Sequence, residues 1–190
     1  MSQAQLPNEL ATFLENWTTD PNNAKDAFVR FKDFLLTTPD VRFDFKARPG
    51  VSYSLRAANA KNDERPLFVL VDVVDDEPEA RWLSVCFYAD MVNDPDELGD
   101  FVPSGLMGKD ACCLNLEEDD PAMRDYILAR LGEAAASAAS FCRAADASAS
   151  VLTGASAASA RERKAASRRS SSGGRTPQSF RTARAARRFC

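Results

Sequence analysis

The 190-residue sequence contains no histidine. Histidine is the side chain whose ordinary pKa lies closest to neutral pH, and it is a common general base and zinc ligand. Its absence excludes Ser-His-Asp and Cys-His catalysis in their usual forms, together with zinc sites built on histidine. Carboxylate, Lys, Tyr and Cys side chains remain available for catalysis. The sequence therefore leans away from an enzyme without forbidding one.

Long apolar segments are absent as well. No stretch approaches the ~20 apolar residues that a membrane-spanning helix needs, and the first residues, MSQAQ, lack the basic start and apolar core of a secretion signal. We therefore expect a cytoplasmic protein without a membrane partner. The five cysteines form an odd number without the spacing of a disulfide framework, so reduced thiols are the simplest expectation.

The net charge of −4 is the sum of two segments of opposite sign. Residues 1–140 hold 13 Lys and Arg against 26 Asp and Glu, a formal charge of −13, together with both Trp and all three Tyr. Residues 141–190 hold 11 basic and 2 acidic residues, a formal charge of +9. The acidic segment has the length and aromatic content of one domain with its own core.

The basic segment has the composition of a disordered tail. Ala, Ser and Arg make up 32 of its 50 residues, which leaves too little apolar area to offset the entropy of ordering the backbone. Ten of its eleven basic residues are Arg. Such a bias fits an evolved basic arm, and it also fits a frameshift or extension product. The sequence leaves both interpretations open.

Helices are expected at both ends of the acidic segment. We expect Asn8 to cap the first helix, and Asp20 and Asp120 to cap the next two, because each of these Asp residues precedes a proline suited to the first helical position. The second helix should end at Thr38, which also precedes a proline. The last helix should fray after Ala135. Apolar residues at helical spacing mark the three helices over residues 10–17, 24–35 and 121–135.

Alternation of apolar and polar residues predicts strands between the helices. The pair Pro49-Gly50 suits the two central positions of a type II turn, so the first two strands should form a hairpin. A long acidic loop is expected before the last strand. The five predicted strands cover residues 41–47, 51–57, 67–74, 81–89 and 111–116. This order predicts an α+β fold, with a five-stranded, mainly antiparallel sheet and the N-terminal and C-terminal helices packed on one face.

One stretch of the acidic segment resembles a known family. The strand pair over residues 67–88 is followed by an acidic stretch, by VPSGL at residues 102–106, and by Lys109 before a strand and a final helix. This order is similar to the YjbR-like (MmcQ) family over about residues 50–136. The resemblance implies a bacterial α+β domain with a double-wing arrangement, often proposed to bind DNA. Members of that family commonly have histidine and tryptophan near the proline-glycine segment and in the following strand, where this chain has Leu106, Met107, Cys112 and Cys113. The resemblance therefore implies the fold rather than a function.

Neither the cysteines nor the acidic clusters predict a metal or cofactor site. Cys112 and Cys113 are adjacent on a predicted strand, so their side chains point to opposite faces and cannot share one metal. Cys86 is expected to pack as a small apolar residue. The loop around Asp94 does not fit the EF-hand spacing from any start, and the acidic turn at residues 75–79 is expected to be a charged hairpin end.

Four residues are candidates for binding a ligand: Arg48, Tyr53, Arg56 and Arg65. They surround the predicted hairpin, in a segment whose net charge is −13. Arg forms bidentate pairs with carboxylates, so these side chains could hold an anionic ligand or the acidic residues of a partner. They could equally serve only to balance the surrounding Asp and Glu.

Three functions remain open at this point. The preferred hypothesis is a small cytoplasmic binding or interaction module, with a second copy or another protein as its partner. The first alternative is nucleic-acid binding through a wing or the basic tail, although the acidic segment repels phosphates and the tail could instead fold back on its own domain. The second alternative is an enzyme without histidine, which requires Arg48, Tyr53 and Arg56 to converge with acidic residues in one pocket.

Overall fold

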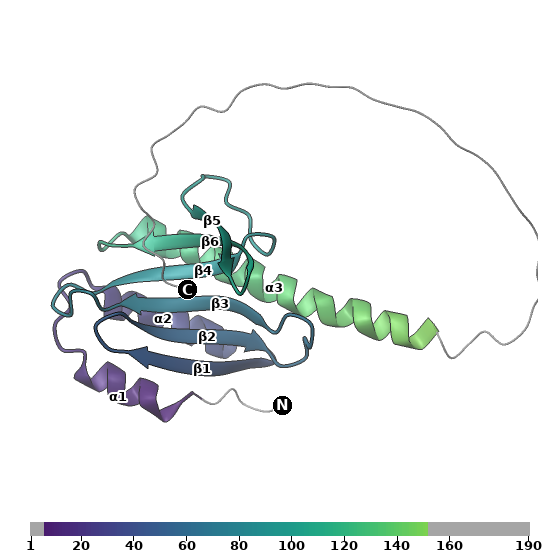
Figure 1. The fold of residues 1–190 in the computed structure, drawn as a ribbon, viewed down its shortest axis with the longest axis horizontal. Coiled ribbons are helices and arrows are strands. Elements are labelled where there is room, and N and C mark those ends of the chain that lie inside the picture. The colour runs from purple at the N-terminus through teal and green to yellow at the C-terminus, as the bar shows by residue number, and fades with distance from the viewer. Residues whose placement is uncertain (1–5, 152–190) are drawn as a thin grey trace, which may run out of the picture.

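The computed structural model describes the backbone of residues 6–151 and the side chains of residues 6–140. This part of the chain has an α+β fold in which three helices accompany a six-stranded antiparallel sheet (Figure 1). The helices are α1 (Asn8–Asn16), α2 (Ala24–Thr37) and α3 (Pro121–Val151). The strands are β1 (Val41–Arg48), β2 (Ser52–Asn59), β3 (Leu67–Val74), β4 (Trp82–Tyr88), β5 (Asp100–Leu106) and β6 (Lys109–Leu116).

The strand order across the sheet is β1-β2-β3-β4-β6-β5. The first four strands are successive neighbours, whereas β6 pairs with β4 and leaves β5 at the edge. The hairpin predicted between the first two strands is confirmed. Its turn is closed by the Val51 N–H, which donates to the Arg48 carbonyl at 2.9 Å. Gly50 has a φ of 75°, the conformation that a type II turn requires at this position.

The prediction of five strands was wrong, because β5 lies inside the segment expected to be a loop. Its pairing with β6 shifts register between Val102 and Leu106, and Ser104 adopts a φ of 55°. Pro103 has no N–H to donate to a neighbouring strand. Irregularities of this kind are tolerated at a sheet edge, where one side needs no partner. The alternation that identified the other strands is therefore missing from β5.

The side chains of the sheet alternate between two faces. On one face Val71, Val85 and Leu114 lie in register across the central strands and are fully buried. Helices α2 and α3 run behind the sheet in Figure 1 and contribute Phe31 and Ile127 to the same core. We call this the helix-covered face. The opposite face, which carries Ser54, Asp72 and Ser84, has no helix among the described elements and is called the helix-free face.

The second helix starts later in the chain than predicted. Asp20, the residue expected to cap it, still accepts hydrogen bonds from its first N–H groups. Helix α2 begins at Ala24 rather than directly after Asp20. The Asp20 carboxylate nevertheless accepts hydrogen bonds from the N–H groups of Ala24 and Lys25, at 2.9 and 3.0 Å. Asn8 does not cap α1, which has Pro7 in the capping position. Helix α2 ends at Thr37, in agreement with the expected stop before a proline.

Helix α3 begins as predicted, since the Asp120 carboxylate accepts hydrogen bonds from the N–H groups of Ala122 and Met123. The expected fraying after Ala135 was wrong, because α3 continues to Val151 and extends past the sheet in Figure 1. The predicted boundary between the acidic domain and the basic tail, at residue 140, thus falls within helix α3. The rest of the predicted tail, residues 152–190, lies outside the described residues. None of the described helices is long and apolar enough to cross a membrane.

Sheet pairing brings two cysteines together. Cys86 on β4 is the register partner of Cys113 on β6, with Cα atoms 4.1 Å apart, and the two form a disulfide. The expectation of reduced thiols was therefore wrong for this pair. Cys112 is free and buried, and alternation along β6 turns its side chain to the other face. The sequence predicts a strand around each of these cysteines, but it does not indicate the register that places Cys86 opposite Cys113.

We expect Cys113→Ser to lower the free energy of unfolding by about 3 kcal/mol, because the cross-link restricts the unfolded chain. The two cysteines are 27 residues apart, a separation long enough for a cost of that size. Urea unfolding of the oxidised proteins measures the loss. The matched control is Cys112→Ser, which removes a buried free thiol and should cost clearly less. Equal losses, or a peptide map without a link between Cys86 and Cys113, would contradict the expectation.

Candidate functional site

The structure distributes the four predicted ligand-binding residues over three places. Arg48 and Arg56 lie on the helix-free face of the β1–β2 hairpin. Tyr53 lies on the helix-covered face, where its ring stacks on Phe13 of α1. Arg65 follows β2 and forms an ion pair near the end of β4. The four side chains therefore do not converge on one site.

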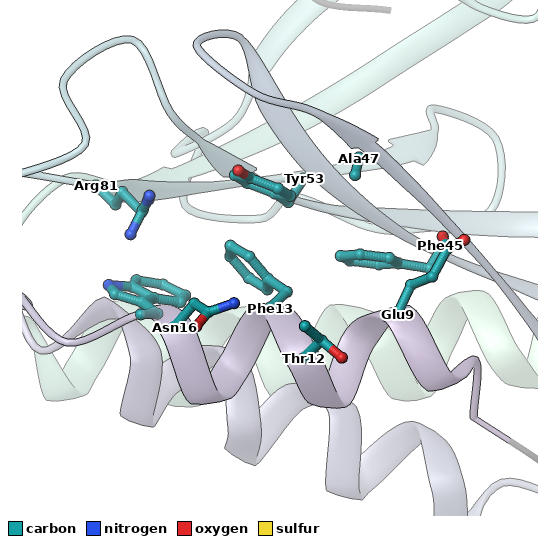
Figure 2. A pocket seen from close by; sticks show the side chains of 9 residues that line it. Glu9, Thr12, Phe13, Asn16, Phe45, Ala47, Tyr53 and Arg81 are labelled. Atoms are coloured by element: carbon teal, nitrogen blue, oxygen red, sulfur yellow. The ribbon is translucent and has the colours of Figure 1, made fainter.

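The Tyr53 side chain belongs to a pocket between α1 and the first two strands (Figure 2). The pocket has a volume of about 460 Å³, which is in the range of small-molecule sites. Helix α1 forms one wall, β1 and β2 form the other, and a residue that precedes β4 closes one end. Nine residues line it: Glu9, Thr12, Phe13, Asn16, Trp17, Phe45, Ala47, Tyr53 and Arg81.

Aromatic rings form the apolar surface of this pocket. The rings of Phe13 and Tyr53 stack with centroids 4.0 Å apart, and the Phe45 ring lies parallel to that of Tyr53 at 6.4 Å. The Trp17 ring lies 5.4 Å from Phe13. Aromatic side chains offer large, rigid contact areas at a low cost in conformational entropy. The set therefore suits a ligand with a flat or otherwise apolar body.

The local sequence explains how the rings are brought together. Phe13 lies in α1, and Trp17 directly follows that helix. Because they are four residues apart, both side chains project from the same side of the helix. The Trp17 indole is fixed by a hydrogen bond from Nε1 to the Thr19 carbonyl at 2.9 Å. On the sheet, Phe45 and Tyr53 occupy diagonal positions on the same face of neighbouring strands. Helical spacing had indicated Phe13 and Trp17 as core residues, but not that they border a pocket.

Arg81 closes one end of the pocket. Its Nε donates to Asp75 Oδ1 at 2.6 Å in a largely buried salt bridge. The other oxygen of Asp75 accepts a hydrogen bond from the Gly50 N–H at 2.7 Å. The Arg81 guanidinium lies 5.6 Å from the Trp17 ring centroid and 5.8 Å from that of Tyr53, within reach of cation–π attraction. Sequence reasoning missed Arg81 as a site residue. The predicted hairpin end at residues 75–79 brings residues 75 and 81 close together, but nothing in the sequence indicated that α1 would lie beside them.

The two ends of the pocket differ in charge. Figure 2 shows Arg81 at one end and Glu9 at the other, with the Phe13 and Tyr53 rings between them. Thr12 lies along the α1 wall and adds a hydroxyl group. The pocket thus has a positive end, an apolar middle and a negative end. Such an arrangement can orient an elongated ligand that is itself polar at its ends.

Asp72 is a second site of interest, at the centre of the helix-free face. Its side chain is buried, with 2% exposure, in the middle of β3. Burial raises the pKa of Asp72, and the Ser54 hydroxyl and the guanidinium groups of Arg48 and Arg56 offset only part of that effect. The carboxyl group therefore keeps its proton to a higher pH than an exposed aspartate does.

Arg65 belongs to a surface ion pair. Its Nη1 donates to both carboxylate oxygens of Asp90 at 3.0 Å, and its guanidinium lies 4.7 Å above the Tyr88 ring. Burial raises the pKa of Tyr88, and the nearby Arg65 acts in the opposite direction. The Asp90 side chain is 65% exposed, and exposed pairs of this kind contribute little to stability. These contacts give Arg65 a local structural role.

Asp94 organises the acidic loop through hydrogen bonds. Its carboxylate accepts the N–H groups of Leu98 and Gly99 and the Tyr126 hydroxyl. Burial acts to raise the pKa of Asp94, but these hydrogen bonds outweigh it and hold the pKa below its ordinary value. Among the described residues, no group of three His, Cys, Asp or Glu side chains is arranged to hold a metal ion. The loop is thus built around a local cap.

Comparison with known proteins gives no match: no family model, curated protein or solved structure is similar to this chain. The resemblance to the YjbR-like family over about residues 50–136 stays a prediction.

We expect Asp72→Asn to raise the free energy of unfolding near neutral pH by about 1–3 kcal/mol, because the neutral amide has a similar shape and removes the desolvation cost of a buried carboxylate. Because burial raises the folded-state pKa above 3.8, the native protein binds the extra proton. The stability of the wild type should therefore fall as the pH rises from the unfolded-state pKa through the folded-state pKa. Urea unfolding over a pH series in phosphate-free buffer measures both effects.

The matched control for that experiment is Asp44→Asn, which removes an exposed carboxylate from the same face. It should change stability little, because the Asp44 side chain is exposed to solvent. A wild-type stability that does not decline over this pH range, or an equal gain from both variants, would show that Asp72 is not the group responsible.

Proposed function

We propose that the protein is a small binding module whose aromatic pocket holds a molecule with a flat or apolar body and a carboxylate. The observation that carries this proposal is the pocket itself, about 460 Å³ between α1 and the sheet edge. Stacked rings supply its walls, and a fixed guanidinium supplies the charge at one end. Concave apolar sites with a few placed polar groups are typical of small-molecule binding.

The charge of Arg81 supports a carboxylate as the polar group of the ligand. The Nε edge of the guanidinium is held by Asp75, so a ligand would meet the Nη groups, which carry further N–H donors. Charge-assisted hydrogen bonds from Arg to carboxylate are strong and directional. Glu9 at the far end would repel an anion there, so it favours one orientation of the bound ligand.

The enzyme hypothesis receives less support from the same geometry. It required Arg48, Tyr53 and Arg56 to meet, yet Tyr53 lies on the face opposite to both arginines. Burial raises the pKa of the free thiol of Cys112, and a protonated thiol is a poor nucleophile. Binding therefore accounts for the described side chains better than catalysis does.

Nucleic-acid binding, a homodimer and a cytoplasmic location stay predictions. The charge of −13 on residues 1–140 weighs against DNA as a partner of the folded part. The Cys86–Cys113 disulfide weighs against a reducing compartment, because stable disulfides are rare in cytoplasmic proteins. The basic tail keeps the nucleic-acid alternative open for the residues outside the described part.

The pocket can be tested with 2-naphthoate, which combines a flat body with a carboxylate. Because the chain has two tryptophans, the background variant Trp82→Phe leaves Trp17 as the reporter at the pocket wall. We expect 2-naphthoate to change Trp17 fluorescence saturably. The neutral 2-naphthamide should bind roughly tenfold more weakly, since it loses the charged hydrogen bond to Arg81.

Pocket occupancy is tested by two substitutions at one position. Ala47 lines the pocket and is exposed, so Ala47→Leu should fill part of the volume and weaken binding at least roughly tenfold through steric overlap. The matched control Ala47→Ser keeps the side chain small and should bind as the parent does. Equal binding of the acid and the amide, or equal binding by both Ala47 variants, would sink the proposal.

A further inference from the structure

Positive side chains without ion pairs gather on one part of the sheet. Elsewhere in the described chain, Arg and Lys mostly pair with an acidic side chain. Four cations of the β1–β2 hairpin form no ion pair among the described residues: Arg42, Lys46, Arg48 and Arg56. Asp44 lies on the same face as these cations. All four cations lie on the helix-free face of the β1–β2 hairpin. They form a locally positive surface on an otherwise acidic domain.

The register of the sheet places polar side chains next to these cations. Ser54 on β2 is the register partner of Asp72 on β3, and Asp72 is in turn the partner of Ser84 on β4. Arg56 is two residues from Ser54 along β2, so it is a diagonal neighbour of Asp72. Ser54 is fully buried, and Asp72 is 2% exposed. Both side chains therefore lie below the surface of the helix-free face.

Three atoms of this group are buried and form no hydrogen bond of regular geometry in the part of the chain that the structure describes: Ser54 Oγ, Arg56 Nε and Asp72 Oδ1. The Ser54 hydroxyl nevertheless lies close enough to the Asp72 carboxyl to act on its pKa. Buried polar atoms in native proteins are nearly always paired. Two of the three are donors, and the third is a carboxyl oxygen that accepts a hydrogen bond when ionised. Ser84 is not part of the set, because its hydroxyl donates to Asn115 at 2.9 Å.

We propose that the helix-free face binds protonated inorganic phosphate through Ser54, Arg56 and Asp72. Arg48, whose Nη2 donates to Ser52 at 2.9 Å, adds positive charge beside the site. The proposal does not depend on the aromatic pocket, which lies on the opposite face of the same hairpin, so either one can fail without the other.

The chemistry of phosphate matches the three unpartnered atoms. Its charged oxygens can accept the Ser54 O–H and the Arg56 N–H, which are the donors of the set. Its remaining P–O–H can donate to the Asp72 carboxylate. Sulfate has the same shape but carries no proton at neutral pH, so it would place an unprotonated oxygen against a buried carboxylate. Asp72 is thus the group that selects a protonated oxyanion.

The environment of Asp72 lowers the cost of placing it next to an anion. Burial raises the pKa of Asp72, which favours sharing a proton with a bound oxyanion over holding an isolated negative charge. The guanidinium groups of Arg48 and Arg56 also face the carboxyl group and act on its charge. Asp44 is the register partner of Arg56, but Arg42, Lys46, Arg48 and Arg56 together outnumber Asp44 and Asp72 on this face. The face as a whole therefore attracts an anion.

Isothermal titration calorimetry of the full chain with inorganic phosphate tests the proposal, in a buffer without other oxyanions and near neutral pH. We expect saturable binding of phosphate. Sulfate and dimethyl phosphate should bind at least roughly tenfold more weakly, because neither offers a P–O–H or S–O–H donor to Asp72. Absence of phosphate binding, or equal affinity for sulfate, overturns the proposal. Equal affinity for dimethyl phosphate overturns it in favour of phosphodiesters such as nucleic acids or phospholipids.

Variants separate a specific site from general positive charge. Arg56→Gln should weaken phosphate binding at least roughly tenfold. Asp72→Asn should raise the affinity for sulfate to that for phosphate, a gain that misfolding cannot produce. The matched control Arg42→Gln removes a cation from the same face but not from the site, and should weaken binding less than about twofold. Equal losses for Arg42→Gln and Arg56→Gln would mean that no specific site exists.

Discussion

Every feature of this protein depends on the register of its antiparallel sheet. Side chains alternate between the two faces of each strand, so a shift of one residue would exchange the faces completely. With Tyr53 paired to Val73 and Ser54 paired to Asp72, the aromatic ring is turned toward the helices and the polar pair away from them. Two sites of different chemistry therefore lie back to back on one hairpin.

The register is held by contacts that also shape the pocket. The Pro49-Gly50 turn fixes the ends of β1 and β2, and Asp75 binds both the Gly50 N–H and the Arg81 side chain. One buried carboxylate thus connects the hairpin turn to the charged end of the pocket. Asp75 has two strong partners, unlike Asp72, which lies buried on β3 without a salt bridge among the described residues. The first carboxylate supports the structure, and the second is suited to a ligand.

The two proposed sites offer a ligand different kinds of contact. On the helix-covered face, stacked rings supply apolar area, and one guanidinium supplies direction. On the helix-free face, hydroxyl, carboxyl and guanidinium groups supply hydrogen bonds, and little apolar contact is required. The arginines of the two sites also differ: Arg81 at the pocket is paired within the protein, whereas Arg48 and Arg56 form no ion pair in the described part of the chain.

The sequence by itself determined the elements with strong periodicity: the hairpin at Pro49-Gly50, the strand over residues 67–74 and the helix that starts after Asp120. It also singled out the arginines of the hairpin. Local rules suffice for these features, because turn chemistry and alternation act between neighbours in the chain. They did not find β5, whose proline and irregular register remove the alternation.

Only the tertiary structure decided which distant residues meet. The Cys86–Cys113 bond and the Arg81–Asp75 pair both depend on strand order or on the path of the loops. The same holds for the Phe13–Tyr53 stack, which requires α1 to fold back on β2. A single sequence records the chemistry of each side chain but not the long-range contacts, because these arise from packing the whole core. The candidate sites could therefore be named in part from the sequence, and located only in the fold.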